Sequence, residues 1–219
     1  MRATVTEELK YILSSTIARY SERYKKLGRN VRTLGWGSEE QQYHRFMQAQ
    51  RVIPIEGKRI LDIGCGFGDF LACCRAEEIY PRHYIGWDIN PDLIAEASQQ
   101  HPDSTFDIVN LAELEVMDPV AEVGVMLGVL NLNFKNSYDN FEFSKMMIEK
   151  AFSSVSEALV VDFLSIYKTP TYPAEDFVFY HDPSAMLGFG LSLTPNVSLY
   201  HDYSPIPQKE FMMVLKHVR

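Results

Sequence analysis

Residues 61–70 read LDIGCGFGDF, an apolar run that ends in three glycines separated by single residues. Glycine has no side chain and tolerates positive φ, so backbone at such positions can approach a ligand closely. The run before the glycines has the character of a short strand, and residues 69–79 have helical spacing. In a parallel sheet, the turn between such a strand and helix lies at the edge where ligands bind. The stretch therefore predicts a ligand-binding loop.

Strands alternate with helices on both sides of this loop. Strands are expected in residues 59–64, 83–89, 104–111, 122–132 and 157–165, and helices in 69–79, 91–101 and 141–156. Such alternation indicates βαβ units and a doubly wound parallel sheet. Two further strands, in 196–203 and 209–218, are separated by a proline-containing connection and predict a final antiparallel hairpin. The expected fold is α/β with a seven-stranded sheet.

The first fifty residues are expected to be helical. Apolar residues recur at three- and four-residue steps from Glu7 to Leu27, and Gly28 stands where a helix would end. Ser38 is placed to begin a second helix, which Pro54 would stop. We expect residues 1–56 to form a helical cap or lid over a domain of residues 57–219, as one folding unit.

Composition limits the classes of partner. The net charge of −8, without a block of basic residues, argues against a nucleic-acid partner, whose binding rests on neutralising phosphates. No apolar stretch approaches the roughly 20 residues that span a bilayer, so no membrane partner is expected. The start does not resemble a signal peptide, and the three cysteines form neither a CxxC pair nor a disulfide framework. We expect a cytoplasmic protein with a small-molecule partner; a homodimer stays open.

Two classes of ligand compete for the glycine loop. A dinucleotide fingerprint needs Gly or Ala at its third position, where this chain has the large, charged Asp69. Asp62, two residues ahead of Gly64, would be a poor neighbour for a pyrophosphate. The loop therefore suits a ligand with a cationic middle.

The stretch LDIGCGFGD resembles the first motif of the class I S-adenosylmethionine-dependent methyltransferases, which reads acidic-x-Gly-x-Gly-x-Gly. The resemblance covers residues 57–165 best and implies a Rossmann-like fold with S-adenosylmethionine as cofactor. It places Asp62 near the amino group of the cofactor and gives Gly64, Cys65 and Gly66 backbone contacts to it.

The ends of the next strands extend this resemblance. Asp88 closes the second strand and would accept hydrogen bonds from both ribose hydroxyls. Asn110 stands where the family often carries an acidic residue for the adenine amino group, and a turn-supporting asparagine is the alternative interpretation. Leu111 could serve adenine through its backbone. Ile89, at the end of the second strand, and Leu127, in the fourth, complete this part of the expected cofactor site.

The resemblance implies in-line methyl transfer to an O or N atom of a small-molecule acceptor. The Asn/Asp-Pro-Pro-aromatic signature of methyltransferases that act on nucleic-acid bases is absent. Arg45 is expected to pair with the methionine carboxylate, with a solvated surface arginine as the alternative. The alternative function is a non-catalytic S-adenosylmethionine-binding or partner-binding protein.

The candidates for a general base are His181, His201 and Tyr203, and a structural role is the alternative for each histidine. The His-Asp pairs at 181–182 and 201–202 lack a recognised ligand spacing, so no metal is expected. Residues 167–187, rich in proline and aromatic residues, are expected to be a substrate-shaping insertion.

Overall fold

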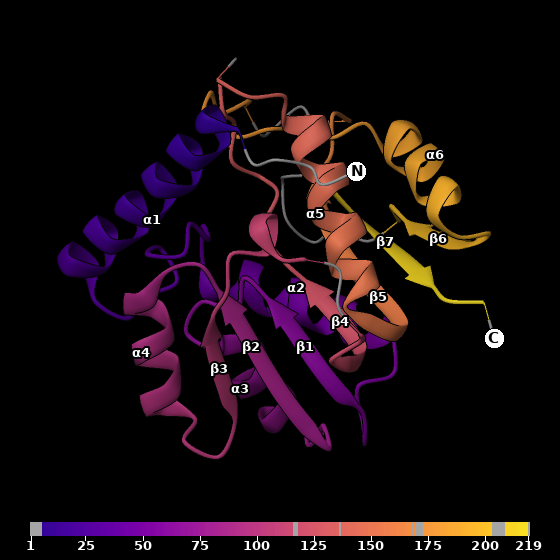
Figure 1. Ribbon diagram of the computed structural model, residues 1–219. Helices are drawn as coiled ribbons and strands as arrows, with labels where there is room; N and C mark the ends of the chain where they lie inside the picture. The colour runs from indigo at the N-terminus through magenta and orange to yellow at the C-terminus, as the bar shows by residue number, and fades with distance from the viewer. Residues whose placement is uncertain are drawn as a thin grey trace.

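The computed structural model describes residues 6–115, 118–135, 137–167, 169, 173–202 and 209–218. A seven-stranded sheet in the order β3-β2-β1-β4-β5-β7-β6 forms its centre (Figure 1). The strands are β1 (Arg59–Ile63), β2 (His83–Asp88), β3 (Thr105–Ile108), β4 (Ala121–Met126), β5 (Val155–Leu164), β6 (Asn196–Tyr200) and β7 (Glu210–Lys216). Strands β1 to β5 pair in parallel, and β7 is antiparallel to both β5 and β6. The predicted doubly wound, Rossmann-like sheet with a final antiparallel hairpin is confirmed.

Helices cover both faces of the sheet, which explains why its central strands are apolar on both sides. Helices α2 (Glu39–Val52) and α3 (Asp69–Ala76) pack on one face, where Phe46 and Phe70 meet Ile60 and Val160. Helix α5 (Asn140–Ser153) packs on the other face, in front of the sheet in Figure 1. Helix α2 is therefore a layer of the fold as well as part of its N-terminal region.

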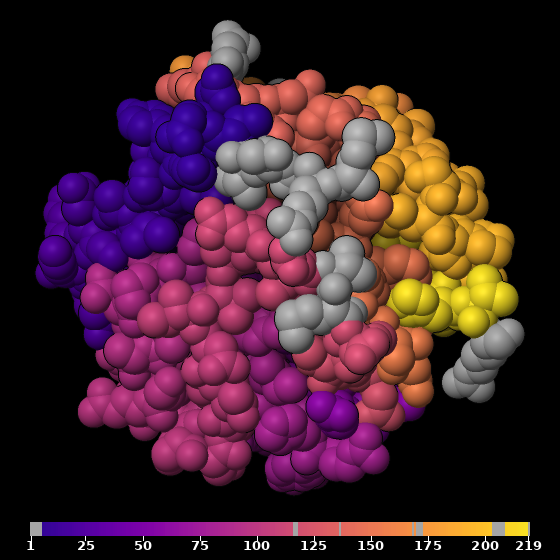
Figure 2. Space-filling view, viewed as in Figure 1, coloured from indigo at the N-terminus to yellow at the C-terminus, as the bar shows by residue number. Residues whose placement is uncertain are grey.

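Side chains cap the starts of several helices, Ser38 among them as predicted. Thr6 caps α1 (Glu7–Leu27), and Ser38 accepts the Gln41 N–H to cap α2. Asn90 accepts two backbone N–H groups at the start of α4 (Pro91–Gln100). Helix α1 contacts α4 on one flank of the molecule, and α6, β6 and β7 form the opposite flank (Figure 2).

Two segments differ from the sequence prediction. The strand expected in 122–132 ends at Met126, because Gly128 turns the chain with a φ of +76° and donates its N–H to Asp162. The expected insertion of residues 167–187 leads into a helix that we did not predict, α6 (Pro183–Leu193). Asp182 caps α6 just ahead of Pro183, the same signal that Asn90 and Pro91 give for α4.

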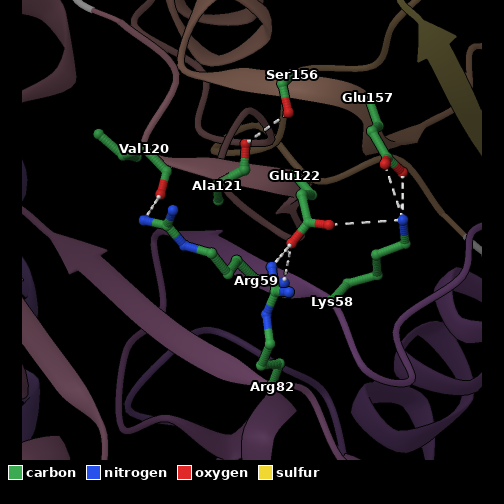
Figure 3. A network of polar contacts seen from close by, with 8 residues as sticks. All are labelled: Lys58, Arg59, Arg82, Val120, Ala121, Glu122, Ser156 and Glu157. Atoms are coloured by element: carbon green, nitrogen blue, oxygen red, sulfur yellow. Dashed lines mark hydrogen bonds and ion pairs between the residues drawn. The ribbon is translucent and has the colours of Figure 1, made fainter.

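Ion pairs link the amino-terminal ends of the parallel strands (Figure 3). Lys58 Nζ lies 2.8 Å from Glu157 Oε2, and Arg82 Nη2 lies 2.6 Å from Glu122 Oε2. Arg59 adds hydrogen bonds to Glu122 and to the Val120 carbonyl. These groups satisfy one another's charges and hydrogen bonds. In the described part of the chain, no helix combines the length and apolar character needed to cross a membrane.

Candidate functional site

The glycine loop follows the carboxyl end of β1, leads into α3 and is hydrogen-bonded to the carboxyl end of β2. The N–H groups of Gly64 and Cys65 both donate to the Trp87 carbonyl, at 2.7 and 3.0 Å. Gly66 donates its N–H to Asp88 Oδ2 at 3.0 Å. Gly64 and Gly66 have φ values of +74° and +55°, a region that favours glycine. Backbone geometry thus fixes the loop against β2.

Neighbouring segments press close against these glycines. A Cβ added to Gly64 would lie 2.4 Å from Val129 Cγ2, and one added to Gly66 would lie 3.0 Å from the methyl groups of Leu34. Leu34 belongs to the link between α1 and α2, and Val129 follows β4. Three segments distant in sequence therefore meet at the loop.

A large cavity lies in front of the loop, and we refer to it as the first cavity. The space between the atoms that line it measures about 1230 Å³, with open solvent at its mouth included. Helix α1 contributes Ile12, Leu13, Thr16 and Tyr20 to its wall. Figure 1 shows α1 on the side toward which the arrows of β1 and β2 point. Nine of the ten residues predicted to bind a cofactor line this cavity: Asp62, Gly64, Cys65, Gly66, Asp88, Ile89, Asn110, Leu111 and Leu127.

Asp88 is hydrogen-bonded to the glycine loop and also lines the first cavity. Its Oδ2 accepts the Gly66 N–H, and its Oδ1 accepts the Asn90 N–H at 2.9 Å. An ionised carboxylate has about four lone-pair sites, so acceptor capacity remains for a ligand. Burial raises the pKa of Asp88, and hydrogen bonds from the backbone N–H groups of Asn90, Gly66 and Ile89 oppose that rise.

Asp62 is the buried carboxyl group beneath the loop. It accepts a hydrogen bond from the hydroxyl of Tyr84. Burial raises the pKa of Asp62 to about 7; the Tyr84 hydrogen bond opposes this rise, and the charge of Asp88 adds to it. A cation bound beside Asp62 would favour the ionised form and lower this pKa.

Asn110 supports a turn, as its alternative interpretation proposed. Its Oδ1 accepts the Ala112 N–H at 3.2 Å and begins the single 3-10 turn η1 (Leu111–Glu113). The residue also lines the first cavity, so the structure combines the two interpretations at one position. Its contact with an adenine remains a prediction.

The sequence did not reveal every residue of the first cavity. Gln42 lines it and donates to Asp69 Oδ2 at 3.1 Å. Tyr20 and Trp36 also line it; the sequence allowed them a place in a lid, although aromatic residues at helical spacing more often belong to a core. Only the folded chain shows that these residues face the glycine loop.

Arg45 is buried and lies outside the first cavity. Its Nη1 lies 3.1 Å from Asp162 Oδ2, its Nη2 donates to Glu210, and its guanidinium lies over the Trp36 ring at 4.6 Å. The alternative of a solvated arginine is wrong, because only 5% of Arg45 is exposed. The contact of Arg45 with a methionine carboxylate stays a prediction. Its ion pairs with Asp162 and Glu210 show that Arg45 has a structural role. Burial raises the pKa of Asp162 to about 6, against the effect of Arg45.

Neither candidate histidine lines the first cavity, and a role as general base stays a prediction for both. His181 Nε2 lies 2.9 Å from Ser144 Oγ, and its ring packs between Phe163 and Phe179. Burial lowers the pKa of His181 to about 3. His201 Nε2 lies 3.0 Å from Ser165 Oγ. Both histidines are held by protein groups, which fits the structural alternative.

Tyr203, the third candidate, lies outside the described residues. Among the residues that the structure describes, no group of three or more His, Cys, Asp and Glu side chains could hold a metal ion.

A second cavity adjoins the first. Five residues line both: Tyr20, Leu34, Trp36, Gly128 and Leu132. The second cavity extends from this junction along α1 to Phe177 and Val178, and Arg19 and Arg23 of α1 line it. Phe177 is 46% exposed, so this end opens to solvent. Two neighbouring cavities provide space for two ligands side by side.

Comparisons with known proteins identify the fold. No family model and no curated protein matches the sequence. Solved structures do match, among them a magnesium protoporphyrin IX methyltransferase from Synechocystis PCC 6803 with bound SAH, with a TM-score of 0.60 and 18% identity over 95% of this chain and 97% of that one. A TehB-like SAM-dependent methyltransferase from Corynebacterium glutamicum matches with a TM-score of 0.58 and 14% identity over 93% of this chain and 100% of the other.

The small RNA methyltransferase HEN1 matches with a TM-score of 0.61 and 16% identity, over 83% of this chain and 26% of HEN1. At such identities the likeness shows a shared fold and leaves the ligands to be argued from this chain's own residues.

Proposed function

We propose that this protein is an S-adenosylmethionine-dependent methyltransferase whose cofactor binds in the first cavity. The observation that carries the proposal is the gathering of the glycine loop, Asp62 and Asp88 around one cavity at the carboxyl edge of a parallel sheet. The methyltransferases that share this fold support it, since the Synechocystis structure holds SAH.

The residues present fit this cofactor. Asp88 has acceptor capacity for ribose hydroxyls, and Asp62 lies where a cationic amino group would be stabilised. Ile89 and Leu111 offer apolar contacts for the adenine, and Asn110 a polar one. Three carboxylates, Asp62, Asp69 and Asp88, line the first cavity in the described part of the chain. This acidic lining suits a sulfonium compound and disfavours a pyrophosphate.

The proposed reaction is methyl transfer to an O or N atom by in-line displacement. The cofactor supplies a methyl group that its sulfonium activates: a bond from carbon to the acceptor atom forms as the carbon–sulfur bond breaks, and the electron pair of that bond stays on sulfur. Tyr20, Trp36 and Gly128 line both cavities and would align the two reactants and exclude water. Positioning alone can supply about 7–11 kcal/mol of the barrier.

The alternative is a protein that binds the cofactor without turnover, whose acceptor cavity would be filled by side chains. Instead, the second cavity is open, and it shares five lining residues with the first. Turnover is therefore the better-supported proposal. The acidic net charge of −8 favours a small-molecule acceptor over RNA, although HEN1 shares the fold.

The experiment is a turnover assay with S-adenosylmethionine labelled with ¹³C at the methyl group. The protein is incubated with a panel of small alcohols, phenols, amines and carboxylic acids, and formation of S-adenosylhomocysteine (SAH) and of labelled product is measured. We expect both with at least one acceptor class and neither with Asp88→Ala. Binding of the cofactor without product from any class would favour the non-catalytic alternative.

A further inference from the structure

We propose that the second cavity binds the methyl acceptor and that this acceptor carries an anionic group, a carboxylate or a phosphate, held by Arg19 and Arg23. The inference rests on the proposed function, because it assumes that the cofactor occupies the first cavity. It adds the chemical class of the substrate, which neither the glycine loop nor the fold supplies.

Arg19 and Arg23 present two cations to one cavity. They lie four residues apart on α1, so they share a face of the helix, and both line the second cavity. In the described part of the chain, neither forms an ion pair with a carboxylate. Their guanidinium groups are therefore available to an anionic ligand, which arginine binds through paired N–H donors.

Arg23 has a donor that the protein leaves unused. Its Nη2 donates to the Arg32 carbonyl, which anchors the side chain. Its Nε is buried and has no hydrogen-bond partner among the described residues. A buried donor without a partner costs free energy, and a ligand oxygen would relieve that cost. Arg19 lies over the Phe177 ring, 5.8 Å from its centroid, near the mouth of the cavity.

The remaining charges of the second cavity do not cancel these two cations. Arg45 also lines it, but Asp162 and Glu210 neutralise that guanidinium. Glu175 is the acidic residue among the described lining residues, so one carboxylate stands against two unpaired arginines. The first cavity is lined by three carboxylates and no cation. The two cavities thus separate a cationic ligand from an anionic one.

The walls of the second cavity indicate the rest of the acceptor. Trp36, Leu132, Leu164, Phe177 and Val178 line it, and such apolar surfaces favour an aromatic or aliphatic body. The junction lies at Tyr20 and Gly128, where a Cβ on Gly128 would lie 3.1 Å from Trp36 Cζ2. An acceptor whose anion meets the arginines would place its far end at this junction. The methylated atom is therefore expected at the end opposite the anionic group.

The test measures binding of four probes of similar size and different charge. Calorimetry is carried out with the full chain saturated with SAH, using benzoate, phenyl phosphate, benzyl alcohol and benzylamine. We expect at least one anion to bind tenfold or more tightly than both uncharged and cationic probes. A preference for benzoate indicates a carboxylate acceptor, and a preference for phenyl phosphate indicates a phosphorylated one.

Two double variants separate the cavity from general charge. Arg19→Gln/Arg23→Gln should weaken anion binding at least tenfold and leave SAH affinity within about twofold. Lys25→Gln/Lys26→Gln removes the same two charges from exposed positions of α1 and should change neither affinity. The inference is overturned if benzyl alcohol binds as well as both anions, if neither anion binds, or if the arginine variant keeps full anion affinity. Failure to bind SAH would instead count against the proposed function.

Discussion

Asp62 allows the cofactor assignment to be tested through pH. It is buried beneath the glycine loop, and its pKa is raised to about 7. In the proposed complex it faces the cationic amino group of S-adenosylmethionine, which favours the ionised carboxylate. Below pH 7 the free protein holds a proton on Asp62 that must leave when the cofactor binds. Affinity should therefore rise with pH.

The size of this effect follows from the pKa. With a pKa of about 7, Asp62 is ionised in about a tenth of the molecules at pH 6 and in half of them at pH 7. The affinity should thus rise about fivefold between pH 6 and pH 7, while the α-amino group of the cofactor, with a pKa of about 7.7–8.0, stays protonated.

The assay is calorimetric titration with S-adenosylmethionine at pH 6.0, 6.5 and 7.0. Repeating it in buffers of different ionisation enthalpy measures the protons released. The Asp62→Asn variant should bind more weakly at pH 7 and lose this dependence, which separates Asp62 from Asp162, whose pKa is about 6. An affinity that is constant or falls between pH 6 and pH 7, or an unchanged pH dependence in Asp62→Asn, would refute the contact.

Three substitutions test the rest of the site. Asp88→Ala should weaken S-adenosylmethionine binding at least tenfold in calorimetry, because it removes the acceptor for ribose hydroxyls and for the Gly66 N–H; unchanged affinity would remove Asp88 from the site. Gly66→Val should abolish binding, since a β-branched residue is strained at a φ of +55° and would meet Leu34. Retained affinity for S-adenosylmethionine would contradict the assignment of the glycine loop to the cofactor site. Arg45→Ala should lower the free energy of unfolding measured in urea by about 3–5 kcal/mol, because it leaves the buried carboxylates of Asp162 and Glu210 without their cationic partner. An unchanged unfolding midpoint would contradict the importance of these ion pairs.

The sequence predicted what depends on local signals. The strand–glycine–helix stretch at residues 61–70 and the cap at Ser38 act within a few residues, and the structure has them where expected. Helix α6 was missed because its cap, Asp182, follows a proline- and aromatic-rich stretch that suggested a loop.

Contacts between distant residues could not be predicted. Arg45 and Glu210 are 165 residues apart, and no pattern near either one indicates the pairing. His181 looked like a candidate base, yet the fold buries it against two phenylalanines, and it lines neither cavity. The second cavity likewise forms between α1 and residues 175–178, which only the folded chain brings together.

The most direct test of the central claim is thermal unfolding with S-adenosylmethionine, SAH and NAD. A ligand at a hundred times its dissociation constant contributes about 2.7 kcal/mol, which should raise the midpoint by about 5–10 °C for a chain of 219 residues. We predict this rise with both sulfur compounds and none with NAD. A rise with NAD alone, or with none of the three, would contradict the assignment of the first cavity to S-adenosylmethionine.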